Sequence, residues 1–284
     1  MKIAVTGARG MLASVLVRKL LSLGHAVLPL DLPEHDLLQL AAVKNYLTAE
    51  RPEFIYNCAA LTDVDLCETE VEKARAINAL AAGNLAEIAV ALDAPILQIS
   101  TDYVFAGDAD RPYLPSAPTA PLSVYGQTKA EGERLISQAP KHFIVRTAWL
   151  YGHNGKNFVE TMLKQAQVRP SLQVVDDQRG APTFVDDFVE ALVLFLPCRE
   201  YGIYHFTNSG ETTWYGFAQE FWAILGIPTP LYPCATREFP RPAPRPAYSV
   251  LDLTKTQSVL KIEIPSWQDA IRRYLSGRNP AGVR

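Results

Sequence analysis

The stretch TGARGMLA, residues 6–13, decides the fold class because it separates two kinds of hydrophobic pattern. Before it, KIAV (residues 2–5) is a short apolar run typical of a buried strand. After it, apolar residues recur at close to the helical period, at Met11, Val15, Leu16, Leu20 and Leu23. Gly24 then stands where a helix commonly ends. A strand, a glycine turn and an amphipathic helix in this order predict the first unit of a dinucleotide-binding fold.

Further strand-like runs follow at intervals long enough for a crossover helix. They are AVLPLD (26–31), EFIYNCAA (53–60), APILQIS (94–100) and HFIVRTAW (142–149). This alternation predicts an α/β protein with an open, doubly wound parallel sheet of Rossmann type. Between the third and fourth runs, Thr69 and Glu72 match a capping box, which would begin a helix whose apolar stripe runs from Ala74 to Leu92.

After about residue 150 the strict alternation of strands and helices decays. Helical patterns and one strand-like run are separated by loops, at 158–167, 187–196, 202–207, 214–225 and 267–275. The proline-dense stretch 237–248 excludes a regular helix or a central strand. We expect residues 1–150 with about 177–207 to form the dinucleotide-binding domain. Residues from about 151–176 and 208–284 would form a smaller, interwoven C-terminal substrate lobe.

Composition argues against several classes of partner. Lys and Arg number 27 against 30 Asp and Glu, and no segment concentrates positive charge as a nucleic-acid binder would need. ALVLFLP (191–197) is too short to span a bilayer, and the chain opens with a strand-like run in place of an export signal. The four cysteines and five histidines show no metal-ligand spacing, so no metal site is predicted. We therefore expect a cytoplasmic protein without a nucleic-acid or membrane partner.

The glycine loop predicts where a dinucleotide would bind. Gly7 and Gly10, followed by the small Ala13, would let backbone amides at the helix start approach a pyrophosphate. Asp31 ends the second strand, where a carboxylate can accept hydrogen bonds from the adenosine ribose of NAD. Arg9 favours the opposite choice, because a guanidinium there could pair with the 2′-phosphate of NADP. The sequence leaves the choice between NADH and NADPH open.

A candidate catalytic group follows the fourth strand. STDYVF (100–105) places Thr101 and Asp102 at the carboxyl edge of the sheet, where ligands bind in this fold class. VYGQTKAEG (124–132) sets Tyr125 and Lys129 one helical turn apart on the same face. A hydroxyl that polarises a carbonyl, a phenol that donates a proton and a nearby cation together suit ketone reduction. A free tyrosine titrates near about 10, and we expect Lys129 to lower that pKa.

Several motifs together resemble a known family. STDYVF, VYGQTKAEGE, IVRTAWLYG, GKNFVETM, DQRGAPT and RPAYSVLD look like dTDP-4-dehydrorhamnose reductase, an extended short-chain dehydrogenase/reductase. The match runs over almost the whole chain. The first two motifs recur in many nucleotide-sugar enzymes, whereas RTAW followed by NF and DQxGAPT is more specific. The resemblance implies an oxidoreductase that reduces the C4 ketone of dTDP-4-dehydro-6-deoxy-L-mannose to dTDP-L-rhamnose with NADPH or NADH.

The resemblance also implies roles for individual residues. Asp31 would lie near the adenosine ribose, and the other implied cofactor contacts are Gly10, Met11, Leu12, Asp36, Leu37, Ala60, Leu61 and Thr62, in addition to Gly7 and Arg9 expected from the glycine loop itself. Lys129 would anchor the nicotinamide ribose and tune Tyr125, which would protonate the C4 oxygen. The expected sugar contacts are Thr62, Thr101, Asp102, Tyr125, Trp149 and Arg245.

Some of these assignments have alternatives in the residues themselves. Trp149 would pack on the hexose, but a core tryptophan fits its position equally well. Of the three arginines in the proline loop, only Arg245 is expected to reach the substrate. Trp214 is expected to fill core. The departures from the family pattern are Arg9, Ala13, Leu61 and Cys67, and none removes a reacting group.

Two rival functions follow from the same residues. One is a reductase or epimerase of another nucleotide sugar, although no Cys–His pair stands out for epimerisation. The other is a non-catalytic regulatory subunit of methionine-adenosyltransferase type. Thr101, Tyr125 and Lys129 are all present, which favours an enzyme. A homodimer, and a divalent cation at a subunit contact, are left open.

Overall fold

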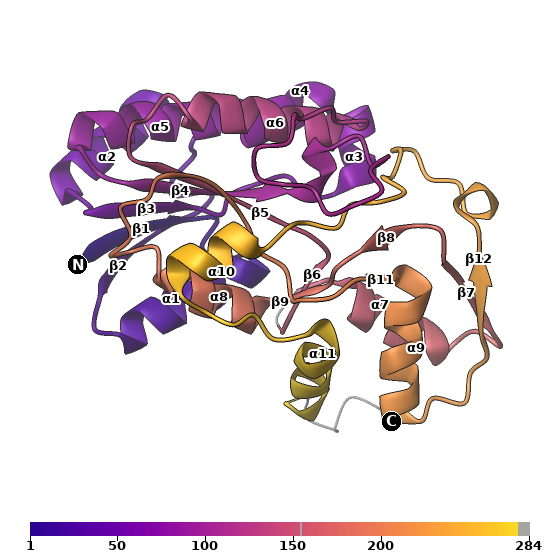
Figure 1. Cartoon of the computed structure of the whole chain (residues 1–284). Helices are drawn as coiled ribbons and strands as arrows, with labels where there is room; N and C mark the ends of the chain where they lie inside the picture. Colours follow the sequence, from indigo (N-terminus) through magenta and orange to yellow (C-terminus); the bar gives the residue numbers. More distant parts are fainter. Residues whose placement is uncertain (154, 278–284) are drawn as a thin grey trace.

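A six-stranded parallel sheet forms the centre of the computed structural model, which describes residues 1–153 and 155–277 (Figure 1). Its strands are β1 (Lys2–Thr6), β2 (Ala26–Leu30), β3 (Phe54–Asn57), β4 (Ile96–Thr101), β5 (His142–Thr147) and β10 (Gly202–His205). They lie in the order β10-β5-β4-β3-β1-β2. This parallel sheet confirms the predicted α/β class. After β2 is added on one side of β1, the chain crosses to the other side of β1 and adds β3 there. Sheets with such a change in strand order bind ligands at that point, between β1 and β3.

Helices cover both faces of the sheet (Figure 1). One face carries α1 (Met11–Ser22), α8 (Val185–Val193) and α10 (Thr254–Leu260). The other carries α2 (Leu40–Glu50), α5 (Ala81–Leu92) and α6 (Val124–Ile136). Strand residues alternate between the two cores: Ile3 and Val5 join the first, and Ala4 joins the second. Because helices cover both faces, the central strands are mostly apolar, and polar residues such as Ser100, Thr101 and Thr147 lie toward their carboxyl ends.

The segment before α5 differs from the prediction. The chain is already helical in α3 (Val64–Thr69), continues through α4 (Val71–Arg75), and forms a π-helical turn, η1 (Ala76–Leu80), before α5. The predicted capping box is wrong: Thr69 ends α3 and its hydroxyl donates to the Leu66 carbonyl at 3.0 Å. The hydroxyl therefore bonds within the preceding turn, and α4 begins at Val71 after Glu70, whose side chain makes no capping hydrogen bond.

The run Val71–Leu92 is long and apolar enough, by length and composition only, to cross a membrane. In the structure it packs against α6 and the central sheet, and 44% of its most apolar window is buried. A core helix passes this test as readily as a membrane span.

A second core gathers the elements that follow β5. It holds side chains of α7 (Phe158–Ala166), α9 (Trp214–Leu225) and α11 (Trp267–Ser276) together with Tyr151 and Phe184. Three short strand pairs surround it: β6 (Leu150–Tyr151) with β9 (Thr183–Phe184), β7 (Leu172–Val175) with β12 (Leu231–Cys234), and β8 (Arg179–Gly180) with β11 (Thr212–Thr213). Most of these strands have two residues, too few to produce a hydrophobic period in the sequence. The 3₁₀ turns are η2 (Asp102–Val104) and η3 (Thr236–Glu238).

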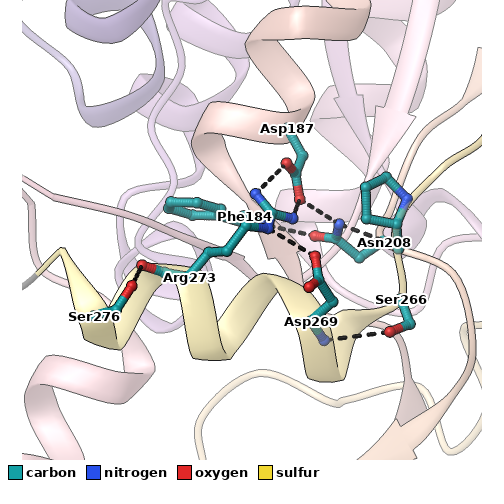
Figure 2. Close-up of polar contacts among 8 residues, drawn as sticks. Phe184, Asp187, Asn208, Ser266, Asp269, Arg273 and Ser276 are labelled. Atoms are coloured by element: carbon teal, nitrogen blue, oxygen red, sulfur yellow. Dashed lines mark hydrogen bonds and ion pairs between the residues drawn. The ribbon is translucent and has the colours of Figure 1, made fainter.

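An ion-pair network joins the last helix to the layer beside the sheet (Figure 2). The Arg273 guanidinium of α11 donates to both carboxylate oxygens of Asp187 in α8, at 2.8 and 2.7 Å, and to Asp269 at 2.7 Å. Asn208 donates to Asp187 at 2.6 Å and accepts from the Phe184 amide at 2.8 Å. The network therefore links elements of both cores.

Candidate active site

A cleft of about 700 Å³ opens at the carboxyl ends of the central strands. It brings together twelve of the sequence-predicted site residues: Gly7, Arg9, Gly10, Met11, Leu12, Ala60, Thr62, Thr101, Asp102, Tyr125, Lys129 and Trp149. These residues come from segments up to about 140 positions apart in the chain. The parallel sheet aligns the ends of its strands, so residues distant in sequence share one edge.

The glycine loop has the geometry of an anion cradle. Gly7 has a φ of +60°, and a Cβ there would lie 2.9 Å from the Ala59 Cα, so both conformation and space require glycine. Gly10 begins α1 without a side-chain cap, and the first turn of α1 carries no acidic residue. The amide groups at this helix start therefore remain available to a negatively charged group in the cleft. These residues fit the pyrophosphate of a dinucleotide.

Arg9 and Asp31 lie beside each other at the rim of this loop. The Arg9 backbone N–H donates to Asp31 Oδ2 at 2.7 Å, while Oδ1 accepts from the Leu32 amide at 2.9 Å. The Arg9 guanidinium donates to the Leu32 carbonyl and pairs with Glu34 at 3.2 Å. Arg9 and Asp31 also line a smaller adjoining cleft of about 480 Å³. The two residues with opposite cofactor preferences therefore face the same space.

Asp102 is the carboxylate among the described residues that line the cleft. It is 1% exposed, and its Oδ1 accepts from the Thr101 hydroxyl at 2.9 Å. Its Oδ2 has no hydrogen-bond partner. Burial raises the pKa of Asp102 to about 6, although the nearby Ser249 and Thr101 hydroxyls oppose the shift. A buried oxygen that lacks a partner and lines a cleft is suited to a ligand hydroxyl.

Tyr125 lies in the first turn of α6, one residue after the helix begins. The Ser123 side chain caps that turn by accepting from the Gly126 amide at 3.1 Å. Burial raises the pKa of Tyr125 above its ordinary value, and the Thr101 hydroxyl lowers it. The direction is opposite to the one we expected from Lys129, because loss of water outweighs the Thr101 hydrogen bond and the Asp102 charge raises the pKa of the phenol further.

Lys129 lies one turn further along the same face. Its Nζ donates to the Ile99 carbonyl at 2.7 Å, and the residue is 3% exposed. Burial lowers the pKa of Lys129 to about 8, while the Glu133 carboxylate raises it. The ammonium is thus directed by the backbone of β4 and remains mainly charged at neutral pH.

Trp149 adopts a φ of 47°, which is uncommon for a residue other than glycine. Its indole stacks on Trp214 with 3.7 Å between ring centroids and 12° between planes. A Cβ at Gly180 would come within 2.7 Å of the same indole. Trp214, expected to fill core, packs against the second core and also lines the cleft from the start of α9.

Other lining residues were not predicted as ligands: Ala13, Cys58, Val64, Ile99, Ser100, Tyr103, Thr147, Ala148, Leu150, Gly155, Lys156 and Trp214. Tyr103 meets the Tyr125 ring edge-on, with 5.6 Å between the ring centroids. Because Tyr103 directly follows Asp102 in STDYVF, the sequence could have identified it as a residue of the cleft. Trp214 and Lys156 come from the segment after residue 150, where no local pattern indicates the cleft.

Five predicted ligands do not line this cleft, over residues 1–153 and 155–277: Asp31, Asp36, Leu37, Leu61 and Arg245. Leu61 exchanges backbone hydrogen bonds with the Asn78 amide, at 2.8 and 3.2 Å. Arg245 donates to Asp65 Oδ1 at 2.9 Å and to the Ala243 carbonyl at 3.1 Å. In the structure the guanidinium is paired with Asp65 of α3 and does not line the cleft, so its role as a ligand stays a prediction.

No group of three His, Cys, Asp or Glu side chains that could hold a metal ion is found within the described residues. Cys58, expected within a strand, instead follows β3 and lines the cleft. Burial raises the pKa of its thiol to about 12, so Cys58 is neutral at ordinary pH.

Comparison with known proteins gives one family. Residues 1–279 match the model described as RmlD substrate binding domain. The chain belongs to this family. An RmlD-family relative, dTDP-4-dehydrorhamnose reductase of Streptomyces griseus, is 40% identical over 94% of this chain and 90% of its own length.

Two further proteins are similar over nearly their whole length. A probable dTDP-4,6-dihydroxy-2-methyloxan-3-one 4-ketoreductase of Streptomyces antibioticus is 40% identical over 96% of this chain and 94% of its own. The crystal structure of dTDP-4-dehydrorhamnose reductase from Bacillus anthracis in complex with NADP has a TM-score of 0.94 and 34% identity. That alignment covers 98% of this chain and 99% of the other.

Proposed function

We propose that this RmlD-family protein is an NAD(P)H-dependent oxidoreductase that reduces the C4 ketone of dTDP-4-dehydro-6-deoxy-L-mannose to dTDP-L-rhamnose. The observation that carries the proposal is the meeting of Thr101, Tyr125 and Lys129 in one cleft with an uncapped helix N-terminus. The names of the relatives supply the substrate class. In this proposal, residues 1–150 with about 177–207 bind the dinucleotide, and the remaining segments bind the sugar.

The bound nicotinamide supplies the hydride in this chemistry. Tyr125 donates its phenolic proton to the oxygen that gains charge at C4. Its raised pKa keeps the phenol protonated before the reaction, as a proton donor requires. Thr101 lies within reach of the same phenol. Its hydroxyl donates to Asp102 Oδ1 in the structure, so it orients the ketone oxygen after turning from that carboxylate. Lys129 presents its charge to the nicotinamide ribose and to the developing phenolate.

The remaining cleft residues orient the substrate. Asp102 Oδ2 accepts a hydroxyl of the sugar and thereby gains the partner that it lacks. The stacked indoles of Trp149 and Trp214 form an aromatic wall beside the hexose. Because Trp214 covers the Trp149 ring, the sugar meets the edge of this stack or displaces Trp214.

The cofactor end suits both coenzymes. Asp31 can accept from the ribose hydroxyls of NADH, while Arg9 can turn to the 2′-phosphate of NADPH. The ion pair of Arg9 with Glu34 is exposed on both sides and therefore weak, so a phosphate can compete for the guanidinium.

A second candidate is supported by the Streptomyces antibioticus relative, whose name gives a different dTDP-linked keto sugar. The same Thr, Tyr and Lys would serve that reduction. The difference between the two substrates would be read by the residues around the sugar ring, principally Asp102, Trp149 and Trp214.

The decisive experiment follows oxidation of NADPH and NADH by the purified protein with dTDP-, UDP- and GDP-linked 4-keto-6-deoxy sugars and with the 2-methyloxan-3-one substrate. We expect turnover with the dTDP-4-dehydrorhamnose substrate. Tyr125→Phe should lower kcat by about 100-fold or more, with little change in NADPH affinity. Full activity of Tyr125→Phe would refute the role of the phenol, and turnover of only the other substrates would refute the proposed sugar.

A further inference from the structure

A buried polar network lies directly behind Lys129. It consists of Glu133, Ser100 and Arg146, which we call the Glu133 network. Glu133 follows Lys129 by one turn on α6 and accepts from the Ser100 hydroxyl at 2.5 Å. Arg146 of β5 donates to both oxygens of the same carboxylate, at 2.9 and 2.7 Å. The two charged side chains are 7% and 2% exposed.

Arg146 is fixed by contacts on its other sides. Its Nη1 donates to the Pro115 carbonyl at 3.2 Å, and its guanidinium lies 4.9 Å from the centre of the Phe105 ring. His205 lies 3.5 Å from Nη1, and burial lowers the pKa of His205 to about 3, so it adds no charge. The buried Arg146 guanidinium thus holds the Glu133 carboxylate by two hydrogen bonds, which favour one orientation of that carboxylate.

Lys129 needs a compensating charge that its own hydrogen bond does not provide. Its Nζ donates to a neutral backbone carbonyl, and a buried ammonium without an anion readily loses its proton. The Glu133 carboxylate is held one helical turn away. An isolated ion pair of Glu133 and Arg146 would bring little net stability, since burying both ions costs several kcal/mol each, about as much as their attraction returns. The Glu133–Arg146 pair would have a function if its carboxylate supplies the negative charge that Lys129 needs.

The other ionisable groups near Lys129 are neutral or act elsewhere. Cys58, after β3, is a neutral thiol, and Tyr125 on α6 is a neutral phenol. Asp102 in η2 contacts Thr101 and acts on Tyr125.

On the remaining neighbours of α6, Glu68 of α3 caps the Val124 amide at 2.8 Å, and the neutral Cys67 lies beside Tyr125. Arg75 of α4 pairs with Glu131 on the outer face. Among the described residues, Glu133 is the carboxylate that acts on Lys129.

We propose that Glu133, held by Arg146 and Ser100, is a positioning residue that keeps Lys129 protonated within the working pH range. The inference deepens the proposed function and rests on the role of Lys129 in it. Burial alone would take the pKa of Lys129 below its present value of about 8, and the carboxylate opposes that shift. Without Glu133, the neighbouring Arg146 cation would remain buried and unpaired, which disfavours a second cation.

The test measures Lys129 directly in Glu133→Gln, which keeps the size and polarity of the side chain. The ¹³Cε resonance of Lys129, assigned by its loss in Lys129→Met, is followed by NMR from pH 6 to 10. We expect the Lys129 pKa to fall by about one unit or more. Glu131→Gln, on the same helix but in an exposed pair with Arg75, should leave the titration unchanged. An unchanged Lys129 pKa in Glu133→Gln would overturn the proposal.

Two further variants test whether Glu133 acts through its charge, and keep the test valid if Glu133→Gln does not fold. Glu133→Asp keeps the charge, and we expect it to restore the Lys129 titration to within about half a unit of the parent. If Glu133→Gln does not fold, Glu133→Gln combined with Arg146→Met removes both buried charges, and the Lys129 pKa should still fall. A parent-like titration in the double variant would overturn the proposal.

NADPH binding, measured by nucleotide fluorescence without a keto sugar, separates this inference from the proposed function. A one-unit shift lowers the protonated fraction at pH 8 from about one half to about one tenth, so NADPH affinity should weaken about fivefold. A shifted Lys129 pKa with unchanged NADPH affinity would leave the Glu133 inference standing and refute the role of Lys129 in cofactor binding.

Discussion

At the residue scale, the cleft contains groups whose pKa values move in different directions for the same reason. Burial raises the pKa of Asp102 to about 6 and lowers that of Lys129 to about 8, because both charged forms lose water. The two groups differ in how they are compensated. Lys129 has the Glu133 carboxylate nearby, whereas one oxygen of Asp102 has no hydrogen-bond partner. The ionised form of Asp102 therefore reduces the stability of the folded state.

Asp102→Asn tests how much the buried Asp102 carboxylate lowers the free energy of unfolding. The folded-state pKa of Asp102 lies above its ordinary value, so its contribution to stability is greatest at low pH and is lost as pH rises through about 6. The amide of the variant cannot ionise, so we expect a gain of roughly 1–3 kcal/mol in unfolding free energy at pH 8 and little at pH 4. Urea unfolding of parent and variant across that range measures the difference.

The same variant should reduce the keto sugar more slowly if Asp102 orients the substrate. A gain in stability that does not depend on pH would show that the carboxylate is not the cause.

At the scale of elements, the close approach of α6 to η2 sets the spacing of Tyr125 and Thr101. A Cβ at Gly126 would lie 2.2 Å from the Tyr103 carbonyl oxygen and 2.9 Å from Pro121. The first turn of α6 can therefore touch the backbone after β4 only because residue 126 has no side chain. Gly83 in α5 differs, since a Cβ there would meet the flexible Leu135 side chain at 3.1 Å.

Gly126→Ala should push the start of α6 away from η2. We expect kcat/KM for the keto sugar to fall about 10- to 100-fold, since small displacements of reacting groups are costly. Stability should fall by about 1–3 kcal/mol, because the contact is with backbone. Gly83→Ala serves as the control and should be near neutral, with the helical preference of alanine offsetting its contact. Equal effects of the two substitutions in kinetics and urea unfolding would contradict this reading.

At the scale of the whole molecule, the ion-pair network of Arg273, Asp187 and Asn208 joins the two cores (Figure 2). Asp187 is largely buried and takes hydrogen bonds from both Arg273 and Asn208. The neighbouring Arg272 makes an ion pair with Glu220 that is more exposed on both sides. The two adjacent arginines of α11 therefore have different structural roles.

Arg273→Met should lower the unfolding free energy by about 2 kcal/mol, because it leaves the buried Asp187 carboxylate without its cation. Arg272→Met should change it by no more than about 0.5 kcal/mol, as is typical of exposed pairs. Urea unfolding followed by tryptophan fluorescence measures both. A loss in Arg272→Met as large as that in Arg273→Met would show that burial of the Asp187 ion pair does not make it the stronger of the two.

The sequence by itself determined the central sheet, its main helices and the identity of Thr101, Tyr125 and Lys129. Each of these depends on a local pattern: a continuous apolar run for a strand, a 3.6-residue period for a helix, the position after a strand for Thr101, and a spacing of four residues for Tyr125 and Lys129. The parallel arrangement then required the strand ends to meet at one edge. Residues such as Asp102 and the glycine loop were recognisable for that reason.

Only the tertiary structure decided which groups lie beside that site and what charge they carry. Trp214 stacks on Trp149, and Arg146 clamps Glu133 behind Lys129, although neither pair is close in sequence. The pKa of Tyr125 rises where the spacing alone suggested a fall. Burial and long-range pairing set these properties, and both depend on where distant segments come to lie.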